Sequence, residues 1–259
     1  VSSIGELMPG SAPSQEDDLF DTLFTGSYPR IHDKKLAPQD WLANYYLTYL
    51  ERDVRQLLNV GNIEAFGRFI RLCAGSCGQL LNLSSLAADG GVSVTTARRW
   101  VSILETSFLL FLLRPHHRSF NKRLVKSPKL YFLDSGLLCY LLRIRSPEQL
   151  TTHASRGAVF ESWVVSELLK NYHNRGATPD LHFWRDSAGH EIDILIDSGQ
   201  GLVPIEVKSG QTFNSDYLRS LTYWRSLPGQ QHSRTALVYG GDSSFMRHAV
   251  AVVSWRQWE

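Results

Sequence analysis

The sequence predicts a mixed α/β fold, with a helical N-terminal part and a C-terminal part whose elements follow the order αβββαβ. Two patterns indicate this class. Apolar residues recur at helical spacing between residues 41 and 106, whereas short runs of Ile, Leu and Val alternate with polar residues after residue 180. A chain of 259 residues that is 43% hydrophobic can bury one large core or two moderate ones.

The first 60 residues are predicted to form an acidic, partly helical lead-in. Residues 1–20 are rich in Ser, Pro and acidic side chains, a composition typical of loosely ordered chain. Residues 41–58 place Leu42, Tyr46 and Leu50 at helical spacing, which predicts an amphipathic helix. The lead-in carries five basic and nine acidic side chains, so its formal charge is −4.

Residues 61–130 are predicted to contain a helix-turn-helix. A helix over residues 64–83 is followed by a short helix, a break at Gly90–Gly91 and a second helix over residues 93–106. The inner stripe of that second helix is apolar and consists of Ala97, Val101 and Leu104. Its outer side is polar and consists of Thr95, Arg98, Arg99 and Ser102. This division is typical of a recognition helix that packs on its scaffold and presents the other face to a groove.

A strongly basic segment follows this helix. Residues 114–129, RPHHRSFNKRLVKSPK, carry six Lys or Arg and no acidic residue. We predict that they form the basic hairpin of a winged helix, which would contact DNA phosphates. The predicted nucleic-acid-binding residues are Arg98, Arg99, Arg114, Arg118, Lys122, Arg123, Lys126 and Lys129. The alternatives are a solvated loop, a patch that docks the acidic lead-in, and a protein-binding helix-turn-helix.

Residues 131–259 are predicted to form one α/β unit. A short strand and a helix capped by Asp134 or Ser135 come first. The αβββαβ order then follows: a helix over residues 157–173, strands over 181–186, 190–197 and 201–210, a helix over 216–227 and a strand over 235–241. Such a run is typical of a mixed sheet flanked by helices.

Acidic residues stand at alternate positions of the second and third of these strands. Because side chains alternate along a strand, the second is predicted to have one face with Glu191, Asp193 and Leu195 and another with Ile192, Ile194 and Ile196. In the third strand Glu206 and Lys208 share a face. The turn DSGQG predicts that the two strands are antiparallel neighbours, which would bring Asp193, Glu206 and Lys208 together.

A fourth acidic candidate lies on the helix over residues 157–173. Glu161 is predicted to project toward the sheet with Val164 and Leu168, where a carboxylate is unfavourable unless it finds a cation. Carboxylates beside a lysine suit Mg²⁺ or Mn²⁺ and imply phosphodiester hydrolysis. The predicted catalytic residues are Asp193, Glu206, Lys208 and Glu161, and the predicted metal ligands are Asp193, Glu206 and Glu161. Ion pairs on a solvent-exposed face are the alternative.

Six motifs carry a family resemblance: GSYPR, YLERDVRQL, LYFLDSGLLCYLL, RGAVFESWVVSELLK, FWRDSAGHEIDILID and PIEVKSG. They resemble the C-terminal half of a prokaryotic family of AAA-type ATPases, known as the domain of unknown function 4143 (DUF4143). The last part is similar to the PD-(D/E)XK nuclease superfamily. This similarity implies a restriction-endonuclease-like fold, and motif matching places the site on Glu161, Asp193, Glu206 and Lys208.

Full-length members of that family begin with a P-loop ATPase domain, but this sequence contains no G-x-x-x-x-G-K-[ST] run. We therefore expect no ATP binding or hydrolysis by this chain alone, and we expect residues 1–60 to follow such a domain in a longer product. The expected domains are 1–60, 61–130 (winged-helix-like) and 131–259 (nuclease-like). The alternative is a catalytically inactive DNA- or protein-binding module that regulates the ATPase.

The expected partners are DNA and an ATPase domain absent from this chain. A membrane partner is not expected, because the longest apolar run, FLLFLL, is much shorter than the roughly 20 residues that span a bilayer. A cytoplasmic location is therefore expected.

Overall fold

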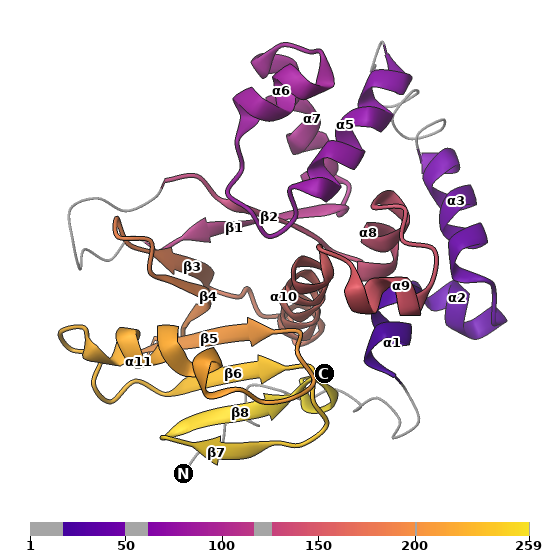
Figure 1. Cartoon of the computed structure of the whole chain (residues 1–259). Coiled ribbons are helices and arrows are strands. Elements are labelled where there is room, and N and C mark those ends of the chain that lie inside the picture. Colours follow the sequence, from indigo (N-terminus) through magenta and orange to yellow (C-terminus); the bar gives the residue numbers. More distant parts are fainter. Residues whose placement is uncertain (1–17, 50–61, 117–125, 200, 259) are drawn as a thin grey trace. The chain divides into compact units, whose positions relative to one another are not determined.

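The fold is given by a computed structural model that describes residues 18–49, 62–116, 126–199 and 201–258 (Figure 1). The chain divides into two compact units. The sheet unit consists of Val1–Leu19, Leu113–Lys129 and Val164–Glu259, and the helical unit consists of Phe20–Leu112 and Leu130–Trp163. No helix in the described ranges is long and apolar enough to cross a membrane.

The described residues before residue 107 are mainly helical. The helices there are α1 (Leu19–Thr25), α2 (Pro29–Lys34), α3 (Pro38–Thr48), α5 (Ile63–Gly75), α6 (Leu83–Gly90) and α7 (Val94–Thr106). Two strands and three helices follow in the described residues: β1 (Leu110–Pro115), β2 (Lys129–Phe132), α8 (Ser135–Leu141), α9 (Pro147–Thr152) and α10 (Arg156–Asn174). The mixed α/β class with a helical N-terminal part is therefore confirmed.

The remaining elements contain the predicted αβββαβ order. They are β3 (Leu181–Arg185), β4 (Glu191–Asp197), β5 (Leu202–Lys208), the 3-10 helix η3 (Ser215–Leu218), α11 (Arg219–Ser226), β6 (Thr235–Tyr239), β7 (Phe245–Arg247), β8 (Val250–Ser254) and the 3-10 helix η4 (Trp255–Gln257). With α10 in front, the order is confirmed through β6. The strands β7 and β8 extend the sheet beyond the prediction.

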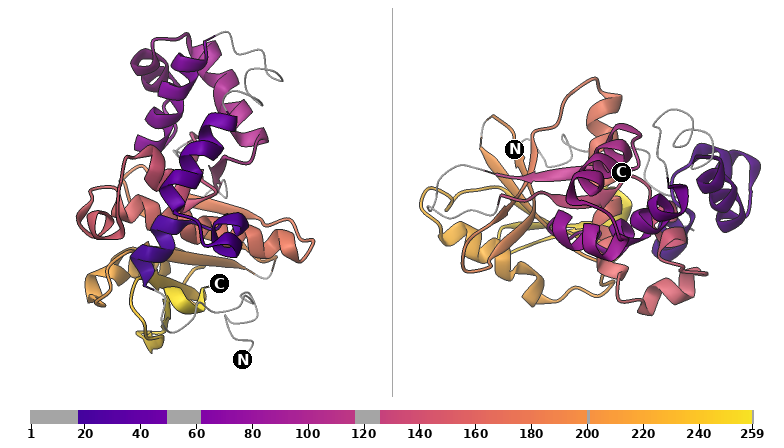
Figure 2. Two further views of the ribbon diagram at one scale, coloured as in Figure 1. Left: turned by 90° about the vertical axis from the view of Figure 1, so that its right-hand side faces the viewer. Right: turned by 90° about the horizontal axis from the view of Figure 1, so that it is seen from above.

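The predicted helix-turn-helix is present in the helical unit as α6 and α7, which pack together with α5 (Figure 2). Gly91 ends α6 with φ +67°, a left-handed conformation that glycine adopts without strain. The hydroxyl of Ser93 then caps α7 by accepting a hydrogen bond from the Thr96 backbone N–H. As predicted, the inner stripe of α7 is buried and Arg98 and Arg99 are exposed.

Two predicted helices differ in extent from the observed ones. The helix predicted over residues 64–83 ends at Gly75, because the chain turns at Gly78, where φ is +74° and the backbone N–H donates to the carbonyl of Leu130. The helix predicted over residues 41–58 is observed within α3 as far as Thr48. The rest of it lies mostly outside the described residues.

The strands are hydrogen-bonded in the order β2-β1-β3-β4-β5-β6-β8-β7. The pairs β3–β4, β4–β5 and β7–β8 are antiparallel, whereas β1–β3, β5–β6 and β6–β8 are parallel, so the sheet is mixed. The antiparallel pairing predicted from the turn DSGQG is confirmed by β4 and β5. Helix α11 makes the crossover from β5 to β6, which parallel neighbours require.

A β-bulge in β4 changes the faces that simple alternation predicts. His182 pairs with Leu195 and Trp184 with Ile192, so two steps along β3 correspond to three along β4. The extra residue brings Ile192 and Leu195 into the same hydrophobic cluster, although alternation placed them on opposite faces. The assignment of all of β4 to two strict faces was therefore wrong.

Helix α11 covers one face of the sheet unit (Figure 1). Its Leu221 and Trp224 are fully buried against Trp184 and Leu237, and the two indole rings meet edge to face at 5.2 Å. Burial of large apolar side chains between helix and sheet is the main source of stability for this face. The same hydrophobic cluster contains Ile192 and Leu195 of β4 and Leu202 of β5, so it helps to hold these two strands together.

Two of the recognised motifs, GSYPR and LYFLDSGLLCYLL, are in close contact within the helical unit. In GSYPR, the backbone N–H and hydroxyl of Ser27 donate to Asp134 Oδ2 at 2.7 and 3.1 Å. In LYFLDSG, Asp134 also caps α8 by accepting from the Leu137 N–H at 2.7 Å, as predicted. Gly26 has φ +75° and lies so close that an added Cβ would be 2.5 Å from Asp134 Oδ1.

Replacing Gly26 with alanine should lower the free energy of unfolding by about 3 kcal/mol, through left-handed strain and the collision with Asp134. Urea denaturation would measure the loss. Gly91→Ala is the matched control, because Gly91 is also left-handed in the helical unit but an added Cβ there would have nothing within 4 Å. That control should lose only about 1 kcal/mol. Equal losses of unfolding free energy in the two variants would contradict the role assigned to the close contact between Gly26 and Asp134.

Candidate functional site

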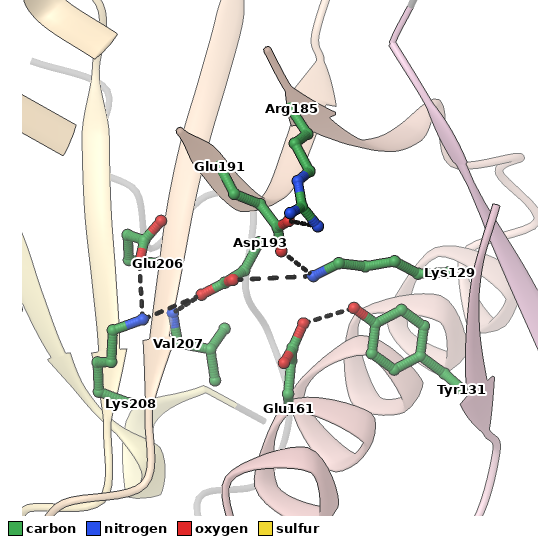
Figure 3. A network of polar contacts seen from close by, with 9 residues as sticks. All are labelled: Lys129, Tyr131, Glu161, Arg185, Glu191, Asp193, Glu206, Val207 and Lys208. Carbon is green, nitrogen blue, oxygen red and sulfur yellow. Dashed lines mark hydrogen bonds and ion pairs between the residues drawn. The ribbon is translucent and has the colours of Figure 1, made fainter. Parts of the chain in front are cut away.

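Asp193, Glu206 and Lys208 come together in the sheet unit, as the sequence predicted (Figure 3). The Lys208 ammonium lies 2.7 Å from Glu206 Oε2 and 3.4 Å from Asp193 Oδ2. Asp193 Oδ2 also accepts a hydrogen bond of 2.9 Å from the Val207 backbone N–H. The antiparallel pairing of β4 with β5 and the side chain of Lys208 thus hold two carboxylates around one cation.

These three side chains differ strongly in burial. The side chain of Glu206 is 2% exposed and that of Asp193 13%, whereas that of Lys208 is 36% exposed. Burial alone would lower the pKa of Lys208, but Asp193 and Glu206 outweigh this effect and raise the pKa above its usual value. Lys208 is therefore a cation at neutral pH. It also has a route to solvent that Glu206 lacks.

A second lysine, Lys129, belongs to the same cluster, although the sequence analysis assigned it to the DNA-binding surface. Lys129 at the start of β2 is 3% exposed, and its ammonium lies 2.5 Å from Glu191 Oε1 and 3.9 Å from Asp193 Oδ1. The ammonium also lies 5.7 Å from the centre of the Phe183 ring. Arg185 approaches the other oxygen of Glu191 at 3.3 Å. Acidic and basic groups therefore alternate through the cluster.

One feature of the sequence could have indicated that Lys129 is buried. It opens KLYF, and all four residues of that strand are buried. A lysine in a buried strand needs a charged partner, because burial of an unpaired ammonium is strongly unfavourable. The basic composition of residues 114–129 concealed this signal, since it favoured a common exposed surface for the whole segment.

A polar cluster closes the turn between β3 and β4. Asp186 accepts from the backbone N–H of His190 at 2.9 Å and from the hydroxyl of Tyr223 at 3.0 Å, and its Oδ2 lies 2.9 Å from His190 Nδ1. Burial opposes ionisation of Asp186, but the bonds from His190 and Tyr223 outweigh it and lower the pKa. The turn is thereby fixed next to the paired residues Arg185 and Glu191.

Glu161 lies in the helical unit, on the N-terminal part of α10. Its Oε1 accepts a hydrogen bond of 2.5 Å from the hydroxyl of Tyr131, which is completely buried. The sequence analysis expected Glu161 to project toward the sheet and to need a cation, whereas the partner in this contact is a hydroxyl group. Its participation in the site with Asp193 and Glu206 stays a prediction.

The donor set fits a hard divalent ion only in part. Among the described residues, no group of three or more His, Cys, Asp or Glu side chains is arranged to hold a metal. Asp193 and Glu206 nevertheless offer carboxylate oxygens on either side of the Lys208 ammonium. Two carboxylates are sufficient for Mg²⁺, because it retains several water ligands. In the structure, the Lys208 ammonium contacts both of these carboxylates.

The predicted nucleic-acid-binding residues fall into three groups. Those that are exposed are Arg98, Arg99, Arg114 and Lys126. Those that lie outside the described residues are Arg118, Lys122 and Arg123. Lys129 is buried in the charged cluster and does not contribute to an exposed basic surface.

Comparison with known proteins assigns the two parts of the chain to different families. Residues 16–148 match the family described as Domain of unknown function (DUF8612), and residues 156–258 match the family described as Domain of unknown function (DUF4143). The resemblance to DUF4143 is thus confirmed for the C-terminal part. Three of the six motifs fall within the DUF8612 match instead: GSYPR, YLERDVRQL and LYFLDSGLLCYLL.

Two curated mycobacterial proteins are similar to the chain. They are uncharacterized protein Mb2031c of Mycobacterium bovis and uncharacterized protein Rv2008c of Mycobacterium tuberculosis, each 31% identical over 205 residues. The similarity covers 79% of this chain and 45% of each relative, so the chain spans about half the length of these relatives. No solved structure matches the chain significantly. Because the DUF8612 match covers more than half of the sequence, the chain belongs to the DUF8612 family, and it continues into a DUF4143 part.

Proposed function

We propose that the chain is a DNA-binding, Mg²⁺-dependent nuclease module, with a winged-helix-like part and a PD-(D/E)XK nuclease-like part. The observation that carries the proposal is the convergence of Asp193, Glu206 and Lys208 on two adjacent strands. Phosphodiester hydrolysis requires a cation to offset charge on the phosphate and an ammonium or similar donor to stabilise the transition state. These three side chains have the chemistry for both tasks.

Asp193 and Glu206 would hold the divalent ion, and Glu161 stays a candidate third ligand. When bound, the ion supplies a Lewis acid beside the phosphodiester. Lys208 lies between the two carboxylates and would leave this position toward solvent, which its 36% side-chain exposure permits. Its ammonium would then donate to a phosphate oxygen. Glu206, at 2% exposure, stays fixed in the sheet.

The test is cleavage of linear, nicked and branched DNA with Mg²⁺ or Mn²⁺. The wild type should cut at least one of these substrates, and Asp193→Ala and Lys208→Ala should cut far more slowly. Identical rates for the three proteins, or no cleavage by the wild type, would contradict the proposal.

Helix α7 is the proposed DNA-reading element. Its inner stripe is buried, so the helix is firmly held, while Arg98 and Arg99 project from the exposed side. The hydroxyl of Ser102 bonds within the helix to the Arg98 carbonyl at 3.2 Å and does not cover that side. Arginine pairs well with phosphates and guanine edges, so this surface suits contact with a DNA groove.

The double variant Arg98→Ala/Arg99→Ala should bind DNA more weakly, and the slope of log K against log salt concentration should fall by up to about two. Fluorescence anisotropy with a labelled duplex at several salt concentrations measures both quantities. The control Arg30→Ala/Arg68→Ala removes the same charge from exposed positions of the helical unit. An unchanged slope in the α7 variant would exclude that surface from the interface.

A second candidate function is a non-catalytic module that regulates an ATPase. The observation that favours it is the pairing of Asp193 and Glu206 with Lys208, which gives each carboxylate a cationic partner without a metal. The curated relatives are more than twice as long as the aligned part, so they have room for a further domain. Calorimetric titration separates the candidates. Absence of Mg²⁺ or Mn²⁺ binding at millimolar concentration would support the regulatory module.

A further inference from the structure

We propose that the sheet unit has a nucleic-acid contact surface of its own, which binds the phosphate backbone of duplex DNA at the end of the sheet where β6 and β8 begin. This surface, the C-terminal basic patch, consists of Arg225, Arg234, Arg247 and His248. It is separate in sequence from residues 98–129, to which the predicted DNA contacts belong. The inference rests on the proposed function only for the choice of DNA as the ligand, and it involves no metal ion.

The strand register brings the patch together at one end of the sheet. The parallel strands β6 and β8 start side by side, since Thr235 pairs with Val250 (Figure 1). Arg234 directly precedes β6, and Arg247 of the antiparallel β7 also pairs with Val250. Neighbouring strands are about 5 Å apart, so the backbones of Arg234 and Arg247 lie about 10 Å apart across β8. Both side chains are exposed.

Helix α11 adds a third arginine to this end of the sheet. Arg225 donates from Nη1 to the His248 carbonyl oxygen at 2.9 Å, which places its guanidinium beside the turn between β7 and β8. The residue is half-buried, and its Nε has no hydrogen-bond partner among the described residues. A carbonyl offsets a positive charge less well than a carboxylate does. This guanidinium would therefore gain from an anionic ligand.

Carboxylates are sparse around the patch. Segments 217–241 and 243–258 contain five arginines and no acidic residue. Two of these arginines pair with acids outside the segments, as Arg219–Asp216 and Arg256–Asp242. The three arginines of the patch have no carboxylate within ion-pair distance in the described part of the chain. Asp197, at the same end of the sheet, is on β4, two strands away from β6, so the patch keeps an uncompensated positive charge.

The turn between β7 and β8 has an unusual backbone conformation. His248 and Ala249 are both left-handed, with φ of 49° and 59°. Hairpin turns with two such residues strongly favour Asn and Gly, because a Cβ is strained in this region. Strained backbone is concentrated at ligand-binding sites, where the surrounding structure maintains it. Here the hydrogen bond from Arg225 holds a turn that leaves Arg247 and His248 exposed.

The chemistry of the patch favours phosphate groups. A planar guanidinium donates two parallel hydrogen bonds to a phosphate, and it remains charged at any physiological pH. Arginines about 10 Å apart suit a row of backbone phosphates better than one small anion. Such contacts carry no sequence information, but they make the affinity depend strongly on salt concentration. The patch would thus add a sequence-independent contact to the one proposed for α7.

The test is binding of a labelled DNA duplex by the full chain, measured by fluorescence anisotropy in EDTA at several salt concentrations. Arg234→Ala/Arg247→Ala should bind about tenfold more weakly, and the slope of log K against log salt concentration should fall by up to about two. Arg225 is left in place because it holds the turn. The control Arg68→Ala/Arg219→Ala removes the same charge from exposed positions elsewhere and should leave the slope unchanged. Circular dichroism verifies folding.

DNA binding that is unchanged in the patch variant overturns this inference, and the proposed function survives that result if Arg98→Ala/Arg99→Ala binds more weakly. An equal change in the patch and control variants also overturns it, because net charge alone would then account for the effect. Absence of DNA binding by the wild type would overturn both proposals. Vesicles containing phosphatidylserine form the last arm. Loss of vesicle binding in the patch variant, with DNA binding unchanged, would assign the patch to lipid headgroups instead.

Discussion

With Mg²⁺ and a DNA substrate, Asp193→Ala is expected to cut at least about a hundredfold more slowly than the wild type. The reason is that Asp193, which the Val207 N–H holds at 2.9 Å beside the Lys208 ammonium, is a proposed metal ligand. Under the proposed function, removal of its carboxylate leaves Glu206 as the remaining proposed ligand from this pair of strands. Lys208→Ala should cause a comparable loss while metal still binds, because the ammonium is assigned to the phosphate.

The control for both variants is Asp216→Ala. Asp216 has a side chain that is 71% exposed, and its ion pair with Arg219 lies on the surface, so its removal changes charge without touching the cluster. Its cleavage rate should equal that of the wild type. Substrate cleavage by Asp193→Ala at the wild-type rate, in a preparation free of contaminating nuclease, would refute the catalytic assignment.

Truncation of Trp224, a fully buried residue of α11, should have the largest effect on the free energy of unfolding. Trp224→Ala is expected to lower the free energy of unfolding by about 3 to 5 kcal/mol, because removal of the fully buried indole leaves a cavity in its place. The indole packs edge to face on Trp184 at 5.2 Å and contributes to the cluster that contains Ile192 and Leu195 of β4. Urea denaturation followed by tryptophan fluorescence and circular dichroism measures the loss.

Met246→Ala serves as the control in the same unit. Met246 lies on β7 with 68% of its surface exposed, so its truncation should change stability by no more than about 0.5 kcal/mol. A loss below about 1 kcal/mol for Trp224→Ala would show that α11 does not secure this face of the sheet.

Local signals determined most of the elements. The helix-turn-helix was predicted from the glycine break at Gly90–Gly91 and the period of the apolar stripe, which are both local features of the sequence. The structure adds the left-handed conformation of Gly91 and the cap of α7 at Ser93. The order αβββαβ was predicted in the same way. The helix predicted over residues 64–83 was too long, because the turn at Gly78 depends on a hydrogen bond to Leu130, which is distant in sequence.

Part of the candidate site was also readable from the sequence. Asp193, Glu206 and Lys208 stand on strands joined by one short turn, so their convergence follows from antiparallel pairing and alternation. The face of Ile192 was predicted incorrectly, since the bulge in β4 depends on the register with β3. No pattern within β4 marks that extra residue.

Sequence patterns were sufficient to predict most of the helices and strands, the antiparallel pairing of β4 with β5 and the three side chains that meet there. The place of Lys129 in the same charged cluster could not be predicted in this way, because its partner Glu191 lies 62 residues further along the chain. The physical reason is that the environment of a side chain is set by whichever strands become neighbours, and a buried ammonium is stable only where the fold supplies carboxylates. Amino-acid composition showed that residues 114–129 are basic, whereas the pairing of the strands determined that Lys129 of this segment is buried.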